Sequence, residues 1–309
     1  MPEVLETIKT ELRRLQQEGV EHVFVDDSTL DLLKSAPGKS DPRSAGPKGG
    51  TPATSDLGAL IDKQKKPARA EPPGPAKPAP TPSAIKPLPQ QPAQIGEIPG
   101  GEKSEQMDWL RRQLEDCPVC REHLSKHGKL VFGAGNVDAD LFFCGEAPGP
   151  AEEIQGEPFV GEAGQLLTKI IQAMGLQRDE VYLANILKWC PEQDNPAGNR
   201  PPTPEEMNFC LPYLKAQIGI VQPKVIVALG NTAVTGLLGP DPKRRMAAVR
   251  GKWHSFDGTP LMITFHPSYL LRNGTLKTKR VLWEDLLQVM EKTGLPVSEK
   301  QRGFFLPKS

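Results

Sequence analysis

Residues Leu141 to Leu167 read LFFCGEAPGPAEEIQGEPFVGEAGQLL and set the fold of the chain. The first four, LFFC, form the short apolar run of a buried strand, and the glycines and prolines from 145 to 150 end it. A second apolar pattern, at helical spacing, begins near Gly164. The stretch therefore predicts a strand, a loop and a helix. In open α/β sheets, ligands bind in such loops at the carboxyl ends of strands.

The loop itself carries polar and aromatic groups. Carboxylates stand at Glu146, Glu152 and Glu153, and Phe159 offers a flat apolar face. With exposed backbone N–H groups, these residues suit a planar polar ligand such as a nucleobase. A Gly/Pro turn with solvated glutamates explains the same loop equally well on its own.

Composition limits the classes of function. The chain has 309 residues, with 38 basic and 38 acidic side chains, so its formal net charge is zero and any contact with nucleic acid must come from local clusters. A membrane span needs a run of about 18 apolar residues, and none exists. The N-terminus has no basic segment followed by an apolar one, so we expect a soluble, cytoplasmic protein.

The chain divides into four parts by composition. Residues 1–35 predict a short amphipathic helical extension, which is either loosely packed or binds a protein partner. Residues 36–101 are rich in Pro and Ala and predict a disordered linker. Residues 102–295 hold the globular domain, and residues 296–309 predict a C-terminal tail.

Strand and helix patterns alternate within the globular domain. The expected strands are Asp140 to Cys144, Val181 to Leu187, Lys224 to Leu229 and Leu261 to Phe265. The expected helices between and after them are Gly164 to Met174, Pro204 to Val221, Thr232 to Leu238 and about Lys279 to Lys292. This alternation predicts a mostly parallel sheet covered by helices on both faces.

All five cysteines fall between residues 117 and 210, which favours thiolate ligands in a reducing compartment over a disulfide scaffold. Cys117 and Cys120 form a CxxC pair, and Cys190 and Cys210 complete a set of four. Cys144 ends a buried strand, where a packed thiol is expected. The spacing leaves zinc, an iron–sulfur cluster and no metal all open.

Three more polar residues stand in or after the predicted strands. His266 follows the last strand, and Arg272 lies one short stretch further on. Asn185 stands in an otherwise apolar strand, where its amide must find partners. One acceptor and one donor match the N3–H and O4 of uracil, whereas cytosine presents the reverse pattern.

Five segments together resemble the family 4 uracil-DNA glycosylases, the iron–sulfur branch of that superfamily. They are GEAPG at 145–149, PFVGEAGQLL at 158–167, the strand with Asn185, NRPPTPEE at 199–206 and HPSYLLR at 266–272. The resemblance implies a three-layer α/β/α sandwich around a four-stranded parallel sheet. It also implies a structural [4Fe–4S] cluster.

The same resemblance implies a role for each matching residue. The implied catalytic residues are Glu146 and His266. The implied uracil-binding residues are Gly145, Ala147, Phe159 and Asn185. The implied DNA-binding residues are Leu270, Leu271 and Arg272, and the implied cluster ligands are Cys117, Cys120, Cys190 and Cys210.

The function that the resemblance implies is hydrolysis of the N-glycosidic bond of uracil flipped out of single- or double-stranded DNA, by a monomeric and monofunctional DNA glycosylase that initiates base excision repair. The alternative is a non-enzymatic module that binds uracil-DNA or serves a polymerase, with the cluster in a structural role. Release of uracil distinguishes the enzyme from the binding module.

Overall fold

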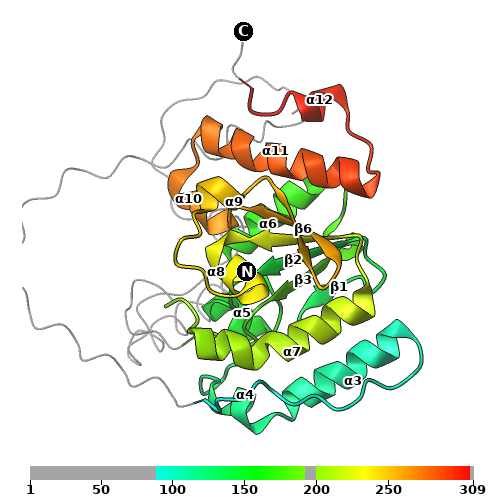
Figure 1. Ribbon diagram of the computed structural model, residues 1–309, viewed down its shortest axis with the longest axis vertical. Helices are drawn as coiled ribbons and strands as arrows, with labels where there is room; N and C mark the ends of the chain where they lie inside the picture. Colours follow the sequence, from blue (N-terminus) through cyan, green and yellow to red (C-terminus); the bar gives the residue numbers. More distant parts are fainter. Residues whose placement is uncertain (1–87, 192–199, 307–309) are drawn as a thin grey trace, which may run out of the picture. The chain divides into compact units, whose positions relative to one another are not determined.

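The computed structural model describes residues 88–191 and 200–306, which form a six-stranded sheet with helices on both faces (Figure 1). The strand order is β1-β3-β2-β4-β6-β5. The strands are β1 (Ala134–Gly135), β2 (Leu141–Gly145), β3 (Tyr182–Asn185), β4 (Val225–Leu229), β5 (Trp253–Phe256) and β6 (Thr259–Thr264). The middle four strands are parallel, as predicted, and the two outer strands are antiparallel.

The helices of the described part are α3 (Lys103–Glu115), α4 (Pro118–Glu122), α5 (Pro150–Gln155), α6 (Glu162–Ala173), α7 (Pro204–Val221), α8 (Gly230–Leu238), α9 (Met246–Val249), α10 (Pro267–Asn273), α11 (Leu276–Thr293) and α12 (Glu299–Arg302), with a short 3₁₀ turn at Arg178–Glu180. None of them is long and apolar enough to cross a membrane. The four predicted helices correspond to α6, α7, α8 and α11.

The strands divide the core into two layers. Phe142 and Cys144 of β2 face a cluster that includes side chains of α3, α7 and α8. Leu141 and Phe143 face the opposite cluster, with α6 and α11. Every residue of β2 is buried, because a central parallel strand has helices on both sides. The expected three-layer α/β/α sandwich is confirmed.

The two edge strands were not predicted. β1 has only two residues, and β5 has an exposed Trp253 and no regular alternation of buried residues. β5 pairs with β6 as a hairpin in which Phe256 lies opposite Thr259. Strand pairing at an edge depends on the neighbouring strand more than on local pattern, so these two elements left little signal.

The register of the parallel strands fixes the position of the site. Gly145 at the end of β2 lies opposite Asn185 at the end of β3. Leu229 of β4 lies opposite Thr264 of β6, two residues before His266. The loops after β2, β3 and β6 therefore meet at one edge of the sheet.

The expected helical extension at 1–35 and most of the expected linker at 36–101 lie outside the described residues, as do 307–309. Residues 88–101 form neither helix nor strand, and the backbone N–H of Ala93 donates to the carbonyl of Phe209 at 3.1 Å. In the expected C-terminal tail, α12 packs on the domain: the indole N–H of Trp283 donates to the carbonyl of Gln301 at 2.6 Å.

Candidate active site

A pocket of about 760 Å³ opens at the carboxyl edge of the sheet. It gathers most of the residues that the sequence nominated for substrate and DNA, which come from the loop after β2, the segment before α6, the end of β3, and α10 with its capping residue. The nominated residues that line it are Glu146, Ala147, Phe159, Asn185, His266, Leu271 and Arg272. Two nominated residues, Gly145 and Leu270, are absent from its lining.

Asn185 is the buried amide of this pocket. Its side chain is 2% exposed, and its Oδ1 has no hydrogen-bond partner within the part of the chain that the structure describes. A buried acceptor without a partner is costly unless a ligand supplies the donor. Gly145 lies directly beside it, where a β-carbon would collide with Asn185 Oδ1 and with the Phe159 ring. Only glycine lets the amide and the ring come so close.

Phe159 is held in an unusual backbone conformation, with φ of 55°. Glu152 stabilises the surrounding loop, because its carboxylate accepts three backbone N–H groups: Gly149 at 3.1 Å, Val160 at 3.0 Å and Gly161 at 2.9 Å. At Gly164, a β-carbon would collide with the Phe159 carbonyl. Glu152, expected from sequence only as a loop carboxylate, therefore orders the segment that carries the aromatic ring.

His266 caps the first turn of α10. Its Nδ1 accepts a hydrogen bond from the backbone N–H of Ser268 at 3.2 Å, and Ser268 Oγ lies 2.9 Å from the same nitrogen. Because Nδ1 is an acceptor, the proton of the neutral ring belongs on Nε2. Burial, together with the nearby Arg272, lowers the pKa of His266 to about 4. At neutral pH the ring is an uncharged hydrogen-bond donor.

Glu146 supplies the pocket with a carboxyl group. Burial raises the pKa of Glu146, and a hydrogen bond with Thr232 and the charge of Arg272 oppose that rise. A carboxylate with a raised pKa accepts a proton more readily than an exposed one.

The two adjacent leucines of α10 have different environments. Leu270 is 5% exposed and packs in the core, whereas Leu271 is 43% exposed and borders the pocket. The sequence nominated both residues, because the pattern of this short segment did not show which side of a helix each leucine would occupy. Only Leu271 is placed to contact a ligand.

Arg200 and Pro201 also line the pocket and were not nominated. Arg200 makes a two-pronged ion pair with the buried Glu206, with both N–O distances at 2.7 Å. Glu206 also accepts from the backbone N–H of Thr203 at 2.8 Å, in the capping box that begins α7. The NRPPTPEE segment thus anchors an arginine at the rim, a contact that its helix-start signal alone did not reveal.

Three of the four nominated cysteines act on one another. A hydrogen bond from Cys120 lowers the pKa of Cys117 to about 5, and the same bond raises the pKa of Cys120. The charge of Cys210 also acts on Cys120, and burial raises the pKa of Cys210 to about 12. Cys190 is buried two residues after Lys188, whose backbone N–H faces the Cys210 thiol.

The chemistry of these thiols, three of which interact with one another, fits the ligand set of an iron–sulfur cluster. Within 88–191 and 200–306, no three His, Cys, Asp or Glu side chains form a site for a single metal ion. A four-iron cluster binds one thiolate at each iron and so spaces its ligands more widely than one ion does. Cys144 is buried within β2, and burial raises the pKa of its thiol to about 12.

Lys188 connects the cysteines to the pocket. Its ammonium group is fully buried and donates to the carbonyls of Asn185 at 3.0 Å and Phe132 at 3.1 Å and to Gln217 Oε1 at 2.7 Å. Burial lowers the pKa of Lys188 to about 8, and the charge of the Cys210 thiol opposes that change. The residue that holds the Asn185 backbone is therefore also a buried cation whose charge interacts with the thiols of Cys210, Cys144 and Cys120.

Comparison with known proteins places this site in a family. A sequence profile described as the uracil DNA glycosylase superfamily matches residues 132–287. A type-4 uracil-DNA glycosylase of Thermotoga maritima is 41% identical over 187 residues, which cover 60% of this chain and 93% of that protein. A type-4 enzyme of Archaeoglobus fulgidus is 45% identical over 129 residues, 42% of this chain and 62% of that protein.

A third relative, from Saccharolobus solfataricus, is also named a type-4 uracil-DNA glycosylase and is 37% identical over 194 residues, which are 60% of this chain and 85% of that protein. The profile includes the loop after β2, the strand with Asn185 and the segment with His266. The chain belongs to the uracil-DNA glycosylase superfamily and, within it, to the type-4 branch.

Proposed function

We propose that this chain is a monofunctional uracil-DNA glycosylase, which hydrolyses the N-glycosidic bond of uracil flipped out of single- or double-stranded DNA and so initiates base excision repair. The observation that carries the proposal is the unpartnered buried Oδ1 of Asn185, in the same pocket as the Phe159 ring and the neutral His266. The type-4 relatives are named as uracil-DNA glycosylases, which supports the same reaction.

Recognition of the base requires a flat apolar surface on which it stacks and polar groups that pair with one of its edges. Uracil stacks on Phe159, whose ring centroid lies 6.3 Å from that of His266. Asn185 Oδ1 accepts from uracil N3–H, and the amide N–H₂ donates to O4. Cytosine has an acceptor at N3 and a donor at N4. The acceptor of the Asn185 amide would therefore face an acceptor, and its donor would face a donor.

Departure of the base is assisted by His266. As the glycosidic bond breaks, uracil takes up negative charge, and the Nε2–H donor stabilises that charge at O2. One such donor is typically worth about 3 kcal/mol in the transition state. The neutral ring can act as this donor, because the backbone N–H of Ser268 donates to Nδ1 and so leaves the ring proton on Nε2.

Glu146 acts on the sugar side of the reaction. The deoxyribose becomes cationic as uracil leaves, and the Glu146 carboxylate stabilises that charge and orients the attacking water. Its raised pKa suits acceptance of a proton from that water. Thr232 fixes the carboxyl group through their shared hydrogen bond.

Binding of DNA uses the exposed face of α10. Leu271 fills the space in the duplex that the flipped base leaves, and Arg272 contacts phosphate. Leu270 has no part in this step, because it is packed in the core. Flipping costs a few kcal/mol, and less for a mispaired base such as uracil opposite guanine.

Cys117, Cys120, Cys190 and Cys210 would hold a [4Fe–4S] cluster. The cluster would have a structural role and cross-link α4, α7 and the segment after β3. Lys188 would place its positive charge beside the thiolates while it fixes the Asn185 carbonyl.

The remaining assignments concern the whole chain. We propose a monomer that works in the cytoplasm, where reduced thiols persist. We propose that the chain consists of a helical extension at 1–35, a linker at 36–101, a catalytic domain at 102–295 and a tail at 296–309. A protein partner of residues 1–35 is part of the same proposal.

The test is release of free uracil from an oligonucleotide with one uracil, followed by hot alkali to cleave the abasic strand. Wild-type protein should release uracil and leave the strand intact until alkali is added. His266→Ala should slow release about 100-fold or more, and Glu146→Ala should slow it also. Binding of the oligonucleotide by wild-type protein without uracil release would refute the enzyme and favour the binding module.

A further inference from the structure

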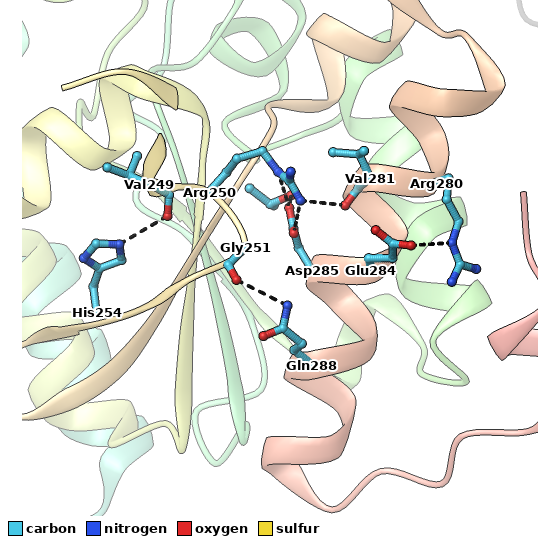
Figure 2. Close-up of polar contacts among 10 residues, drawn as sticks. Val249, Arg250, Gly251, His254, Arg280, Val281, Glu284, Asp285 and Gln288 are labelled. Carbon is cyan, nitrogen blue, oxygen red and sulfur yellow. Dashed lines mark hydrogen bonds and ion pairs between the residues drawn. The ribbon is translucent and has the colours of Figure 1, made fainter. Parts of the chain in front are cut away.

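A buried ion pair lies behind the strand that leads to His266. Figure 2 shows Asp285 of α11 facing Arg250, which follows α9. The Asp285 carboxylate accepts from both Arg250 Nε, at 3.1 Å, and Arg250 Nη2. It also accepts from Thr264 Oγ1 at 2.6 Å. Asp285 is fully buried, so one carboxylate links a loop, a helix and the end of β6.

The turn after Arg250 is shaped around this carboxylate. Gly251 has φ of 67°, and a β-carbon there would come within 2.6 Å of Asp285 Oδ1. The backbone N–H of Gly251 donates to the carbonyl of Ile263 at 2.9 Å, and Gln288 Nε2 donates to the Gly251 carbonyl at 3.3 Å. Figure 2 shows the second of these bonds beside the ion pair.

The network holds both residues that precede His266. Thr264 is bonded to Asp285 directly. The guanidinium carbon of Arg250 lies 5.5 Å from the centroid of the Phe265 ring, and that ring stacks on Tyr269 of α10 at 4.8 Å. None of the three network residues lines the uracil pocket.

A buried ion pair adds little stability compared with well-packed apolar side chains, so its presence calls for another role. A catalytic donor must be held within about 0.5 Å of its productive position. We propose that Asp285 is a positioning residue for His266, acting through Thr264 and Arg250 to fix the end of β6. This inference rests on the proposed function, because it assigns His266 to the departing uracil.

The kinetic test uses Asp285→Asn, which keeps the shape of the side chain and removes its charge. We expect the single-turnover rate of uracil release to fall about tenfold or more, because a displaced donor stabilises the transition state less. KM should stay nearly constant. Thr264→Val removes only the hydroxyl and provides a second variant if Asp285→Asn folds poorly. A raised KM with an unchanged rate would overturn the inference.

The matched control is Glu284→Gln, one residue away on the same helix. Glu284 accepts from Arg280 Nε at 2.8 Å in a more exposed pair between two residues of α11 itself (Figure 2). This variant should release uracil at the wild-type rate. A loss equal to that of Asp285→Asn would mean that any lost charge on α11 has the same effect, and would overturn the inference.

A double-mutant cycle separates positioning from general destabilisation. In a His266→Ala background, Asp285→Asn should cause little further loss, because the group that it positions is gone. The same fold-loss in both backgrounds would overturn the inference. The imidazole NMR signal of His266 gives a readout independent of catalysis: it should shift in Asp285→Asn and Thr264→Val but not in Glu284→Gln. An unshifted signal would refute positioning even if the protein released no uracil.

Discussion

At the scale of single residues, the pocket depends on groups whose states are set by their neighbours. His266 stays neutral because it is buried and close to Arg272, and its tautomer follows from the bond with the Ser268 backbone. Asn185 keeps a free acceptor because Gly145 has no side chain to fill the space beside it. Both states suit a neutral base that leaves as an anion.

The depressed pKa of His266 makes stability depend on pH. The unfolded ring has a pKa near 6.5 and the folded ring one of about 4, so the unfolded chain binds more protons between these values. The free energy of unfolding should therefore fall as pH drops from about 7 to about 4, with about 3 kcal/mol from this group. Urea denaturation of wild type and His266→Gln measures the difference between them. An equal pH dependence in the two proteins would contradict the assignment.

The sequence was informative about most residues that we propose to contact substrate and uninformative about the residues that hold them in place. Asn185 was visible because a polar amide stood in an apolar strand, and His266 because it followed one. Asp285 gave no such signal, because its partner Arg250 lies 35 positions away and only the packing of α11 on β6 brings them together. Glu152 was visible only as a carboxylate in a loop.

At the scale of elements, short helices and tight loops direct the side chains around the sheet edge. α10 begins at Pro267 with His266 as its cap, so one helix start orients the donor and sets the phase of the two leucines. The sequence predicted the four central strands and the long helices from their periodicity. It did not predict α10, because seven residues carry too little pattern.

The two leucines of α10 lie on different sides of the helix, so their substitution should have different effects. Leu271→Ala should lower uracil release from duplex DNA about tenfold and leave single-stranded DNA nearly unaffected, because only the duplex must be held open. Leu270→Ala should instead lower the free energy of unfolding by about 2–5 kcal/mol, since it leaves a cavity. Paired excision rates and denaturation curves measure both. Equal losses on the two DNA forms for Leu271→Ala would exclude the wedge role.

The loop held by Glu152 provides a second prediction at this scale. Glu152→Ala should lower the free energy of unfolding by about 2 kcal/mol and slow uracil release, because three backbone N–H groups lose their acceptor and Phe159 loses its support. Glu152→Gln should be intermediate, since its amide oxygen still accepts from Val160 and Gly161. Glu157→Gln, in the same loop but exposed, is the control. A stable, active Glu152→Ala protein would show that the loop keeps its conformation without the Glu152 carboxylate.

At the scale of the whole molecule, the cysteines and the uracil pocket are joined through Lys188. Its ammonium group bonds to the end of β3, to α7 and to the segment before β1. The CxxC spacing indicated a thiolate site but left the metal open, and the family resemblance supplied the cluster. The link from thiols to pocket was not readable from sequence, because it runs through a buried side chain.

Substitution of two buried cysteines, one inside and one outside the proposed ligand set, tests the proposed cluster. Cys210→Ala should lose iron and the visible absorption of an iron–sulfur cluster, and its melting temperature should fall. Cys144→Ala should keep its full iron content, because that thiol is packed in the buried strand β2 and is not in the proposed ligand set. Iron content per chain decides between them. Equal iron in Cys210→Ala and wild type would remove Cys210 from the ligand set.

The measurement that tests the central claim most directly is the single-turnover rate of base release from two duplexes that differ only in one base, uracil or cytosine. Wild-type protein should release uracil and no cytosine, because Asn185 presents its acceptor to N3–H. Asn185→Ala should lose about 100-fold or more of the rate on uracil. Uracil release by Asn185→Ala at the wild-type rate, or release of cytosine by the wild-type protein, would contradict the account of this pocket.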